Sequence, residues 1–408
     1  MDLFLRDRIK NAEITWPDLV TALNDSTRFN PYCRAHSYFQ IFKDLFLSLI
    51  LDNEIILLDS DFSENELVNL TGYTTFEKFD KQIKVPAIHS KRELIHLVFS
   101  NKKNWRLSLF TSGTTGHPKK ISHDFKSITR LVKMSEKREE NVWGLAYNPT
   151  HMAGVQVFFQ AAMNGCSIVR LFGLSQDEVL EEIENYQVSH ISSTPTFYRL
   201  LLPVHKKIES VKRLTSGGEK FKKGVLNELK NVFPNAKISN IYASTEAGAL
   251  LESYGDTFEV KAVLEKYLRV KDNELLIHNS LIGFREKSEG WYSTGDLVEI
   301  VANNPLKFRF VSRKSSLINV GGYNVNPHEV EGIIEEIPGV SAARVYAKEN
   351  SVLGNIICSE VVLKKKNLNE KEIRSTLQSK LQEYKIPRMI NFVDKITTTR
   401  TGKISRIN

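Results

Sequence analysis

The sequence has few cysteines and no long apolar run. Its three cysteines, Cys33, Cys166 and Cys358, lie far apart and form no Cys-x-x-Cys pair, which argues against a disulfide framework and a structural zinc site. The first residues mix charged and apolar side chains, so they lack the apolar core of a signal peptide. No stretch approaches the ~20 apolar residues of a membrane span. We therefore expect a soluble protein of the reducing cytoplasm, with no membrane span.

The composition is otherwise that of a globular protein. The 408 residues are 41% hydrophobic and 25% charged, enough for two or three domains with a sizeable core. The formal net charge of +8 suits anionic ligands or a partner with an acidic surface, but charge alone gives no argument for nucleic acid. The sequence shows no internal repeats and no low-complexity segment.

A Walker phosphate-binding motif is absent as well. That motif requires Gly-Lys followed by Ser or Thr, whereas Gly116 is followed by His117 and Pro118. The segment 111–120 is nevertheless rich in small hydroxyl residues and glycines, and its backbone N–H groups and hydroxyls can converge on an anion. A plain surface loop is the alternative for this segment taken alone. The residues expected to bind the phosphates of a nucleoside triphosphate are Thr111, Ser112, Gly113, Thr114, Thr115, Gly116 and Lys119, with Lys120 adding charge nearby.

Alternating β-rich runs and helical patterns indicate an α/β fold. Between about residues 53 and 244 the pattern is that of parallel sheets covered by helices. A small β-rich subdomain is expected from about 258 to 300, followed by a compact α+β module. We predict a large N-terminal domain over residues 1–311 and a small C-terminal domain over residues 312–408. Buried strands are expected over residues 54–58, 106–110, 142–147, 167–171, 190–193 and 237–242. Helix caps are expected at Ser175 with Glu178, at Asn326 and at Asn369.

Four further segments accompany residues 111–120, and they are residues 240–248, 291–296, 311–331 and 397–406. In order and rough spacing, the five segments resemble the motifs of the adenylate-forming superfamily. That group includes acyl- and aryl-CoA synthetases, the adenylation domains of peptide synthetases, and luciferases. The resemblance implies that a carboxylate attacks the α-phosphate of ATP, that pyrophosphate leaves, and that a thiol then takes the acyl group from the acyl-adenylate. It extends from about residue 105 to the C-terminus.

The segment Asn-Ile-Tyr-Ala-Ser-Thr-Glu-Ala-Gly at residues 240–248 resembles the family's Tyr-Gly-x-Thr-Glu signature. The resemblance implies that Tyr242 stacks on adenine, that Thr245 bonds the α-phosphate and that Glu246 holds magnesium. Ala243 stands where the family usually has glycine. A buried structural tyrosine and a surface glutamate are the alternatives for this segment taken alone.

Two later motifs concern the ribose and the reacting carboxylate. The segment Trp-Tyr-Ser-Thr-Gly-Asp at residues 291–296 resembles the family's Tyr-x-Thr-Gly-Asp, which implies that Asp296 accepts both ribose hydroxyls and that Arg313 is a second ribose contact. An isolated Thr-Gly-Asp is more often a turn. Lys403, in a terminal Gly-Lys motif, is implied to bridge the substrate carboxylate and the α-phosphate. Without the family context, Lys403 would be a surface charge near a chain end.

The start of the C-terminal domain resembles the family's interdomain hinge. In that family this small domain is mobile and rotates between an adenylation and a thioester-forming orientation. The hinge is expected at Lys314 and Ser315, and Ser315 and Ser316 stand where the family has acidic or lysine residues. Gly321 and Gly322 would let a loop approach the thiol channel, with turn glycines as the alternative.

His151 indicates the substrate class. In amino-acid-activating relatives this region supplies an aspartate that pairs with the substrate ammonium, whereas His151 lies in a setting that resembles the Phe-His-x-x-Gly of acyl- and aryl-CoA synthetases. Because an unpaired buried ammonium is costly, an α-amino acid is disfavoured. The residues expected to bind the acid are His151, Gly154, Ser216, Gly217, Gly218, Ala243, Ala247 and Gly248.

The sequence therefore predicts an ATP- and magnesium-dependent ligase that forms an acyl- or aryl-adenylate from a small-molecule carboxylic acid and joins the acid to a thiol, with coenzyme A favoured. Lys403, Glu246, Thr245 and His151 are the expected catalytic residues. A stand-alone adenylation enzyme that loads the phosphopantetheine of a carrier protein is one alternative, since both thiols end in the same arm. A catalytically inactive relative that binds a nucleotide or an acyl ligand is another. The absence of a Walker motif disfavours a P-loop kinase or ATPase.

Overall fold

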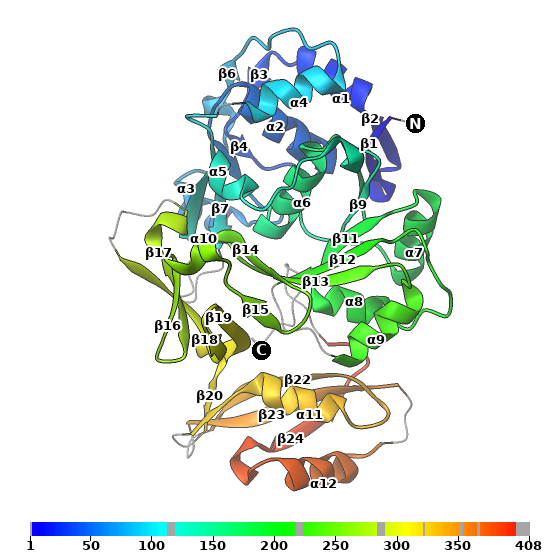
Figure 1. Ribbon diagram of the computed structural model, residues 1–408, viewed down its shortest axis with the longest axis vertical. Helices are drawn as coiled ribbons and strands as arrows, with labels where there is room; N and C mark the ends of the chain where they lie inside the picture. Colours follow the sequence, from blue (N-terminus) through cyan, green and yellow to red (C-terminus); the bar gives the residue numbers. More distant parts are fainter. Residues whose placement is uncertain are drawn as a thin grey trace. The chain divides into compact units, whose positions relative to one another are not determined.

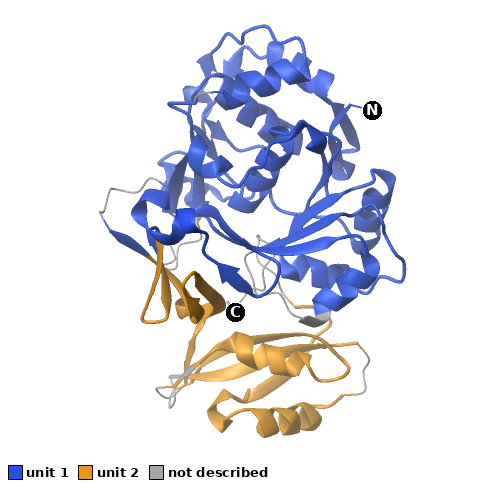
Figure 2. Cartoon of the chain, in the orientation of Figure 1, with its two compact units in different colours: residues 1–267, 277–292 blue, residues 268–276, 293–408 orange. Residues whose placement is uncertain are grey.

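The protein is described by a computed structural model over residues 2–100, 102–111, 119–217, 223–283, 290–320, 323–350, 354–364 and 368–396. The chain divides into two compact units (Figure 2). Unit 1 holds residues 1–267 and 277–292, and unit 2 holds residues 268–276 and 293–408. The domain boundary expected after residue 311 stays a prediction, because the division into units follows compactness and assigns the β-rich segment from residue 293 to unit 2.

The larger sheet of unit 1 has the strand order β14-β13-β12-β11-β9-β10-β1-β2 (Figure 1). The strands from β13 to β1 run parallel to their neighbours, while β14 and β2 pair antiparallel at the two edges. The strands are β1 (Leu3–Asp7), β2 (Ala12–Thr15), β9 (Val142–Leu145), β10 (Ser167–Arg170), β11 (His190–Ser193), β12 (Arg213–Gly217), β13 (Lys237–Ser244) and β14 (Gly248–Ser253).

Helices connect the successive parallel strands β9 to β13, as parallel pairing requires. They are α6 (Met152–Ala162), α7 (Gln176–Asn185), α8 (Pro195–Leu201) and α9 (Lys223–Val232). Helix α7 begins at a capping box in which Ser175 and Glu178 satisfy each other's backbone N–H groups. This is the cap that the sequence pattern predicts.

The smaller sheet of unit 1 has the order β4-β5-β7-β8, parallel except for β8. Its strands are β4 (Tyr32–Cys33), β5 (Ile55–Leu57), β7 (Arg106–Thr111) and β8 (Lys119–Asp124). A buried aromatic cluster that includes Trp16, Phe42, Phe46 and Phe158 forms part of the core of unit 1. The remaining elements of unit 1 are α1 (Trp16–Asn24), β3 (Arg28–Phe29), α2 (Tyr38–Ile50), α3 (Glu64–Thr71), β6 (Lys81–Gln82), α4 (Lys91–Phe99), α5 (Phe125–Thr129), β15 (Thr257–Glu259) and α10 (Ala262–Glu265).

Unit 2 contains antiparallel strands followed by an α+β module. Helices α11 and α12 begin at the asparagine caps Asn326 and Asn369, as the sequence predicts. The strands are β16 (Leu268–Lys271), β17 (Glu274–His278), β18 (Trp291–Asn303), β19 (Leu306–Arg313), β20 (Ile318–Val320), β21 (Tyr323–Val325), β22 (Val340–Asn350), β23 (Gly354–Leu363) and β24 (Met389–Phe392), and the helices are α11 (Pro327–Glu335) and α12 (Glu370–Lys380). Residues 277–278 of β17 and residues 291–292 of β18 belong to unit 1. Short 3-10 turns occupy Arg8–Lys10, Glu77–Phe79, Glu136–Arg138, Asn279–Leu281, Lys314–Ser316 and Glu383–Lys385.

The predicted α/β class is confirmed, and each of the six expected strands is present within three residues of its predicted ends. These six strands belong to two sheets, because β5 and β7 pair in the smaller one. Among the described residues, no helix combines the length and the apolar character that a membrane crossing needs.

Candidate active site

The turn between β13 and β14 carries the residues expected to bind the α-phosphate and magnesium. Ser244 pairs with Gly248 across the turn, and Gly248 has a φ of +66°, a left-handed conformation that favours glycine. Thr245 and Glu246 lie in the turn and are partly exposed. Within the described part of the chain, their side chains make no hydrogen bond or ion pair. Both side chains are therefore available to a ligand.

Tyr242, the expected adenine contact, is buried near the end of β13. Its ring centroid lies 6.5 Å from that of Phe258 in an edge-to-face arrangement. The strand pairing shifts register between Tyr242 and Ala243, and such an irregularity redirects side chains at a strand end. Ala243 is partly exposed and Ala247 is buried. Their contacts with adenine and acid stay predictions.

The backbone of this turn is held by three groups that sequence reasoning missed. The carbonyls of three consecutive residues, 245 to 247, each accept a hydrogen bond from a distant part of unit 1. The pairs are His123 Nε2 with the Thr245 oxygen at 2.7 Å, the Gly283 backbone nitrogen with the Glu246 oxygen at 2.7 Å, and Arg130 Nη1 with the Ala247 oxygen at 3.0 Å.

The predicted phosphate loop joins two antiparallel strands. Thr111, the last residue of β7, pairs with Lys119, the first residue of β8, so the loop is not the strand-to-helix turn of a Walker motif. Lys119 is exposed, and Lys120 Nζ lies 2.9 Å from Glu54 Oε1. Five of the predicted phosphate contacts lie outside the described residues, namely Ser112, Gly113, Thr114, Thr115 and Gly116.

His151 is fixed by a buried carboxylate that the sequence did not reveal. Its Nε2 lies 2.8 Å from Oδ2 of Asp59, which is 7% exposed and follows β5. Asn148 and Thr150 donate to the other carboxylate oxygen. Burial acts to raise the pKa of Asp59, but these hydrogen bonds and the charge of His151 outweigh it, so the pKa is lowered. Asp59 is thus ionised at neutral pH and orients the imidazole.

The remaining residues expected to bind the acid lie close to the backbone of neighbouring segments. A Cβ atom on Gly154 would come within 2.2 Å of the Asn148 carbonyl oxygen, so this glycine lets α6 approach the loop before it. A Cβ atom on Gly217, at the end of β12, would lie 3.1 Å from the Ile241 oxygen. Ser216 is buried, and its hydroxyl has no hydrogen-bond partner among the described residues. Gly218 lies outside the described residues.

In unit 2, the two predicted ribose contacts bind each other. Asp296 and Arg313 are opposite residues of β18 and β19, and Arg313 Nε donates to Asp296 Oδ1 at 2.7 Å. Asp296 is 6% exposed, whereas the Arg313 side chain is 51% exposed. Gly295 precedes the aspartate with a φ of +72°, and its N–H donates to Glu274 Oε1 at 2.7 Å. The Asp296–Arg313 pair therefore places both predicted ribose contacts side by side.

The expected hinge forms a single 3-10 turn over residues 314–316. Lys314 Nζ lies 4.0 Å from Glu274 Oε2, and Ser315 is exposed. Gly321 and Gly322, the expected thiol-channel glycines, and Lys403, the expected catalytic lysine, lie outside the described residues. Their roles stay predictions.

The side chains that could serve as metal ligands fit a magnesium ion that arrives bound to a nucleotide. Among the residues that the structure describes, no three His, Cys, Asp or Glu side chains gather as a metal site. Mg²⁺ is usually held by one or two carboxylates together with substrate phosphates, so one carboxylate such as Glu246 is the expected protein ligand.

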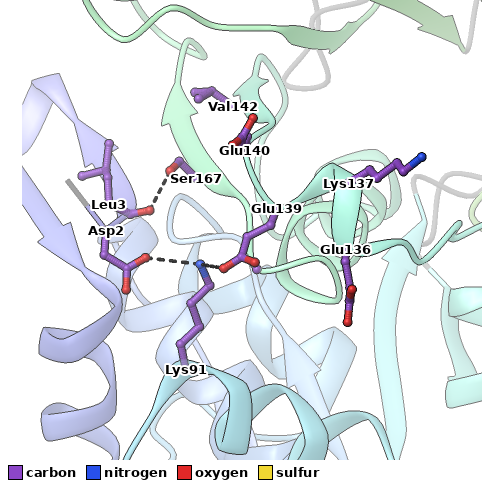
Figure 3. Close-up of a pocket in the computed structure, with 10 residues that line it drawn as sticks. Asp2, Leu3, Lys91, Glu136, Lys137, Glu139, Glu140, Val142 and Ser167 are labelled. Atoms are coloured by element: carbon purple, nitrogen blue, oxygen red, sulfur yellow. Dashed lines mark hydrogen bonds and ion pairs between the residues drawn. The ribbon is translucent and has the colours of Figure 1, made fainter.

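A cavity of about 690 Å³ lies elsewhere in unit 1 (Figure 3). Its Lys91 ammonium sits between two carboxylates, 2.7 Å from Glu139 Oε1 and 3.2 Å from Asp2 Oδ1. None of the predicted site residues lines it. Because its central cation is already paired, the cavity is not assigned to the nucleotide or the acid.

Comparison with known proteins agrees with this architecture. The family model for AMP-binding enzymes matches residues 43–270, more than half of the chain, and the model for the C-terminal domain of AMP-binding enzymes matches residues 329–403. The chain belongs to the AMP-binding enzyme family. The predicted membership of the adenylate-forming superfamily is therefore confirmed.

The similar curated proteins are CoA ligases. The chain is 25% identical over 337 residues to the 2-succinylbenzoate--CoA ligase of Listeria monocytogenes, which covers 74% of this chain and 70% of that protein. It is 27% identical to the 4-hydroxybutyrate--CoA ligase 1 of Metallosphaera sedula, over 74% of this chain and 61% of that protein. The chain thus spans about two thirds of the length of these relatives.

Solved structures share the fold over nearly the whole chain. The o-succinylbenzoate CoA synthetase of Bacillus subtilis, in complex with its acyl-adenylate intermediate, matches with a TM-score of 0.70 at 18% identity and covers 99% of this chain and 94% of that one. ATP-bound MatB from Rhodopseudomonas palustris matches with a TM-score of 0.72 at 16% identity, with the same coverage.

Proposed function

We propose that this protein is an ATP-dependent carboxylate ligase that forms an acyl- or aryl-adenylate, releases pyrophosphate and transfers the acyl group to coenzyme A. Membership of the AMP-binding family supports an AMP-forming acid–thiol ligase, and the curated relatives are named CoA ligases. The observation that carries the proposal is the β13–β14 turn, in which three backbone carbonyls accept hydrogen bonds while the side chains of Thr245 and Glu246 stay available.

The catalytic problem in this reaction is electrostatic. Two anions must meet while charge builds on the phosphorus, so oriented donors and cations supply most of the stabilisation. When bound, Mg²⁺ neutralises phosphate charge. In our proposal Thr245 donates to the α-phosphate, Glu246 holds the ion, and Lys403 neutralises the carboxylate and phosphate as they approach.

The acid site is proposed to lie around His151. Asp59 accepts a hydrogen bond from His151 Nε2, and this bond fixes the orientation of the imidazole ring. Relatives are named for 2-succinylbenzoate and 4-hydroxybutyrate, acids that carry a second oxygen function. We therefore include such acids among the first substrates to test.

The deciding experiment is carboxylate-dependent exchange of pyrophosphate into ATP, measured with aryl, short-chain, long-chain, dicarboxylic and amino acids, with and without magnesium. Exchange with one acid class supports the adenylation step. Coenzyme A and a phosphopantetheinylated carrier protein are then compared as acceptors, and thioester formed only on the carrier favours the adenylation enzyme of a carrier system. No exchange with any acid favours an inactive binding protein.

A matched pair of variants tests the proposed catalytic lysine. Lys403→Ala is expected to abolish exchange and to leave ATP binding largely intact, because the lysine is proposed to act on the reacting carboxylate and α-phosphate. Lys395→Ala, at a lysine outside the Gly-Lys motif, serves as the control. Full exchange in the Lys403 variant would remove the role assigned to it.

A further inference from the structure

The three groups that hold the β13–β14 turn come from separate parts of unit 1. His123 lies in β8, Arg130 follows α5, and Gly283 follows the 3-10 turn at Asn279–Leu281. They lie on both sides of the turn in the sequence, and His123 and Thr245 are 122 residues apart. The turn is therefore fixed only once these segments have packed together.

His123 presents a single, directed donor to the turn. The ring is 0% exposed, and its Nε2 faces the Thr245 carbonyl oxygen at 2.7 Å. A carbonyl oxygen only accepts, so Nε2 carries the hydrogen. Burial has the largest effect and lowers the pKa of His123, and the charge of Arg130 lowers it further, against the opposing effects of the Thr245 hydrogen bond and of Asp124 and Glu246. The histidine is therefore neutral at pH 7.

Arg130 ties the turn to the segment that carries Gly283. Its Nη1 donates to the Ala247 carbonyl at 3.0 Å, and its Nη2 donates to the Leu281 carbonyl at 3.3 Å. Burial lowers the pKa of Arg130, and Asp124 opposes this effect. A guanidinium holds two acceptors in a fixed planar geometry, which an ammonium cannot do.

Gly283 completes the set because only a glycine fits there. Its N–H donates to the Glu246 carbonyl at 2.7 Å. A Cβ atom would lie 2.8 Å from both Ile121 Cγ2 and the Ser122 carbonyl oxygen, and 2.9 Å from His123 Cε1. The glycine thus packs directly on β8 beside the histidine.

We propose that His123 and Arg130 are positioning residues of this turn, and that together with Gly283 they fix Thr245 and Glu246 in a ligand-ready orientation before ATP binds. The inference rests on the proposed function. A group that is oriented in advance loses less freedom when it binds the transition state, and a displacement of about 1 Å can lower the rate about 100-fold.

Hydrogen–deuterium exchange of the unliganded protein tests the structural part of this proposal. Peptides covering residues 242–250 are compared in the wild type, His123→Ala, Arg130→Met and His190→Ala. His190 is a matched control because it is another buried histidine of unit 1, and its ring contacts Trp143 rather than the turn. We expect about 10-fold faster hydrogen–deuterium exchange in His123→Ala and Arg130→Met only, because each of these variants loses a hydrogen bond that keeps the turn closed. The proposal is overturned if His123→Ala and Arg130→Met both exchange at the wild-type rate. It is also overturned if His190→Ala shows the same increase as these two variants.

Kinetics test the catalytic part. We expect kcat for pyrophosphate exchange to fall about 100-fold in His123→Ala, with a smaller change in the KM for ATP and a higher magnesium concentration at half-saturation. His123→Gln, which keeps an N–H donor at a similar reach, is expected to restore part of kcat. The positioning role is overturned if kcat falls only in proportion to the fraction of folded protein and the magnesium concentration at half-saturation is unchanged. If the wild type shows no pyrophosphate exchange with any acid, the proposed function fails. Hydrogen–deuterium exchange then still decides whether the turn is held.

Discussion

Two segments that carry residues expected to bind the nucleotide are supported in different ways. In unit 1, the turn over residues 244–247 is held through its backbone carbonyls by buried groups from elsewhere in the fold. In unit 2, the part of β18 around Asp296 is held partly through the side chain of Asp296 itself, which is bonded to Arg313 on β19. Both Asp296 and Arg313 are predicted ribose contacts.

In unit 1, the residues that support the turn differ from those expected to bind the ligand. In unit 2, Asp296 and Arg313 are expected to do both. A substitution at His123 or Arg130 changes the orientation of the turn without removing a predicted ligand contact. A substitution at Asp296 or Arg313 removes a predicted contact and its support together. We therefore expect the two segments to respond differently to mutation.

The largest effect is expected for Asp296→Ala. This variant removes the carboxylate that is proposed to accept both ribose hydroxyls, and hydrogen bonds to a charged group contribute about 1.5–3 kcal/mol each. The KM for ATP in pyrophosphate exchange should rise about 100-fold or more. Glu299→Ala, at an exposed carboxylate on the same strand, is the matched control. An ATP KM within about twofold of wild type in the Asp296 variant would show that Asp296 only supports this part of β18.

The second prediction concerns the stability of unit 1 at acidic pH. Burial, the largest effect, and the charges of Arg213, Arg138 and Lys212 together lower the pKa of His190 to about 4. The unfolded chain therefore takes up a proton near pH 6.5, which the folded protein does not bind until about pH 4. Stability is complete above pH 6.5 and falls as pH decreases through this window, by about 3 kcal/mol for this residue.

His190→Phe keeps a ring beside Trp143 and removes this titration. All four tryptophans lie in unit 1, whereas unit 2 has His328 as its one histidine. Urea unfolding followed by tryptophan fluorescence at pH 7 and pH 4.5 therefore reports on unit 1. We expect the free energy of unfolding to fall less in the variant than in the wild type as the pH is lowered. An equal fall in both proteins contradicts the assignment to His190.

Gly283→Ala should produce a smaller, mixed effect. The added methyl group meets the backbone of Ser122 and the ring of His123, and overpacking of this kind costs about 1–3 kcal/mol. We expect a lower melting temperature together with a lower kcat for exchange. Gly255→Ala, where a Cβ atom has open space, is the control. Loss of stability with kcat unchanged per folded molecule would mean that Gly283 fills space but does not support the turn.

The smallest effect is expected for Lys120→Ala. The Lys120–Glu54 pair is half-exposed, with side-chain exposures of 42% and 39%, and such pairs contribute about 0–1 kcal/mol. Stability should change by less than 1 kcal/mol, and the KM for ATP should stay near that of the wild type. A large increase in KM would instead assign Lys120 to the phosphates, beside the predicted contact Lys119.

The strands of unit 1 were largely predictable because each is a short run of apolar residues that the sheet buries. The predicted 190–193 strand coincides with β11, and the predicted 106–110 strand is one residue shorter than β7. The N-terminal strands were not predicted. β1 pairs with β10, which lies more than 160 residues away, and the pattern of a short segment does not indicate a partner at such a distance.

The sequence by itself determined the class of chemistry, because the hydroxyl, carboxylate and lysine residues that the reaction needs occur in an ordered series of motifs. It also determined the helix caps and the buried strands, which depend on neighbouring residues. Only the tertiary structure decided what holds the predicted site residues: Asp59 behind His151, and His123 with Arg130 behind the turn. These partners lie about 90 to 120 residues from the groups they hold. A hydrogen bond depends on distance in space, and folding alone brings such residues within 3 Å.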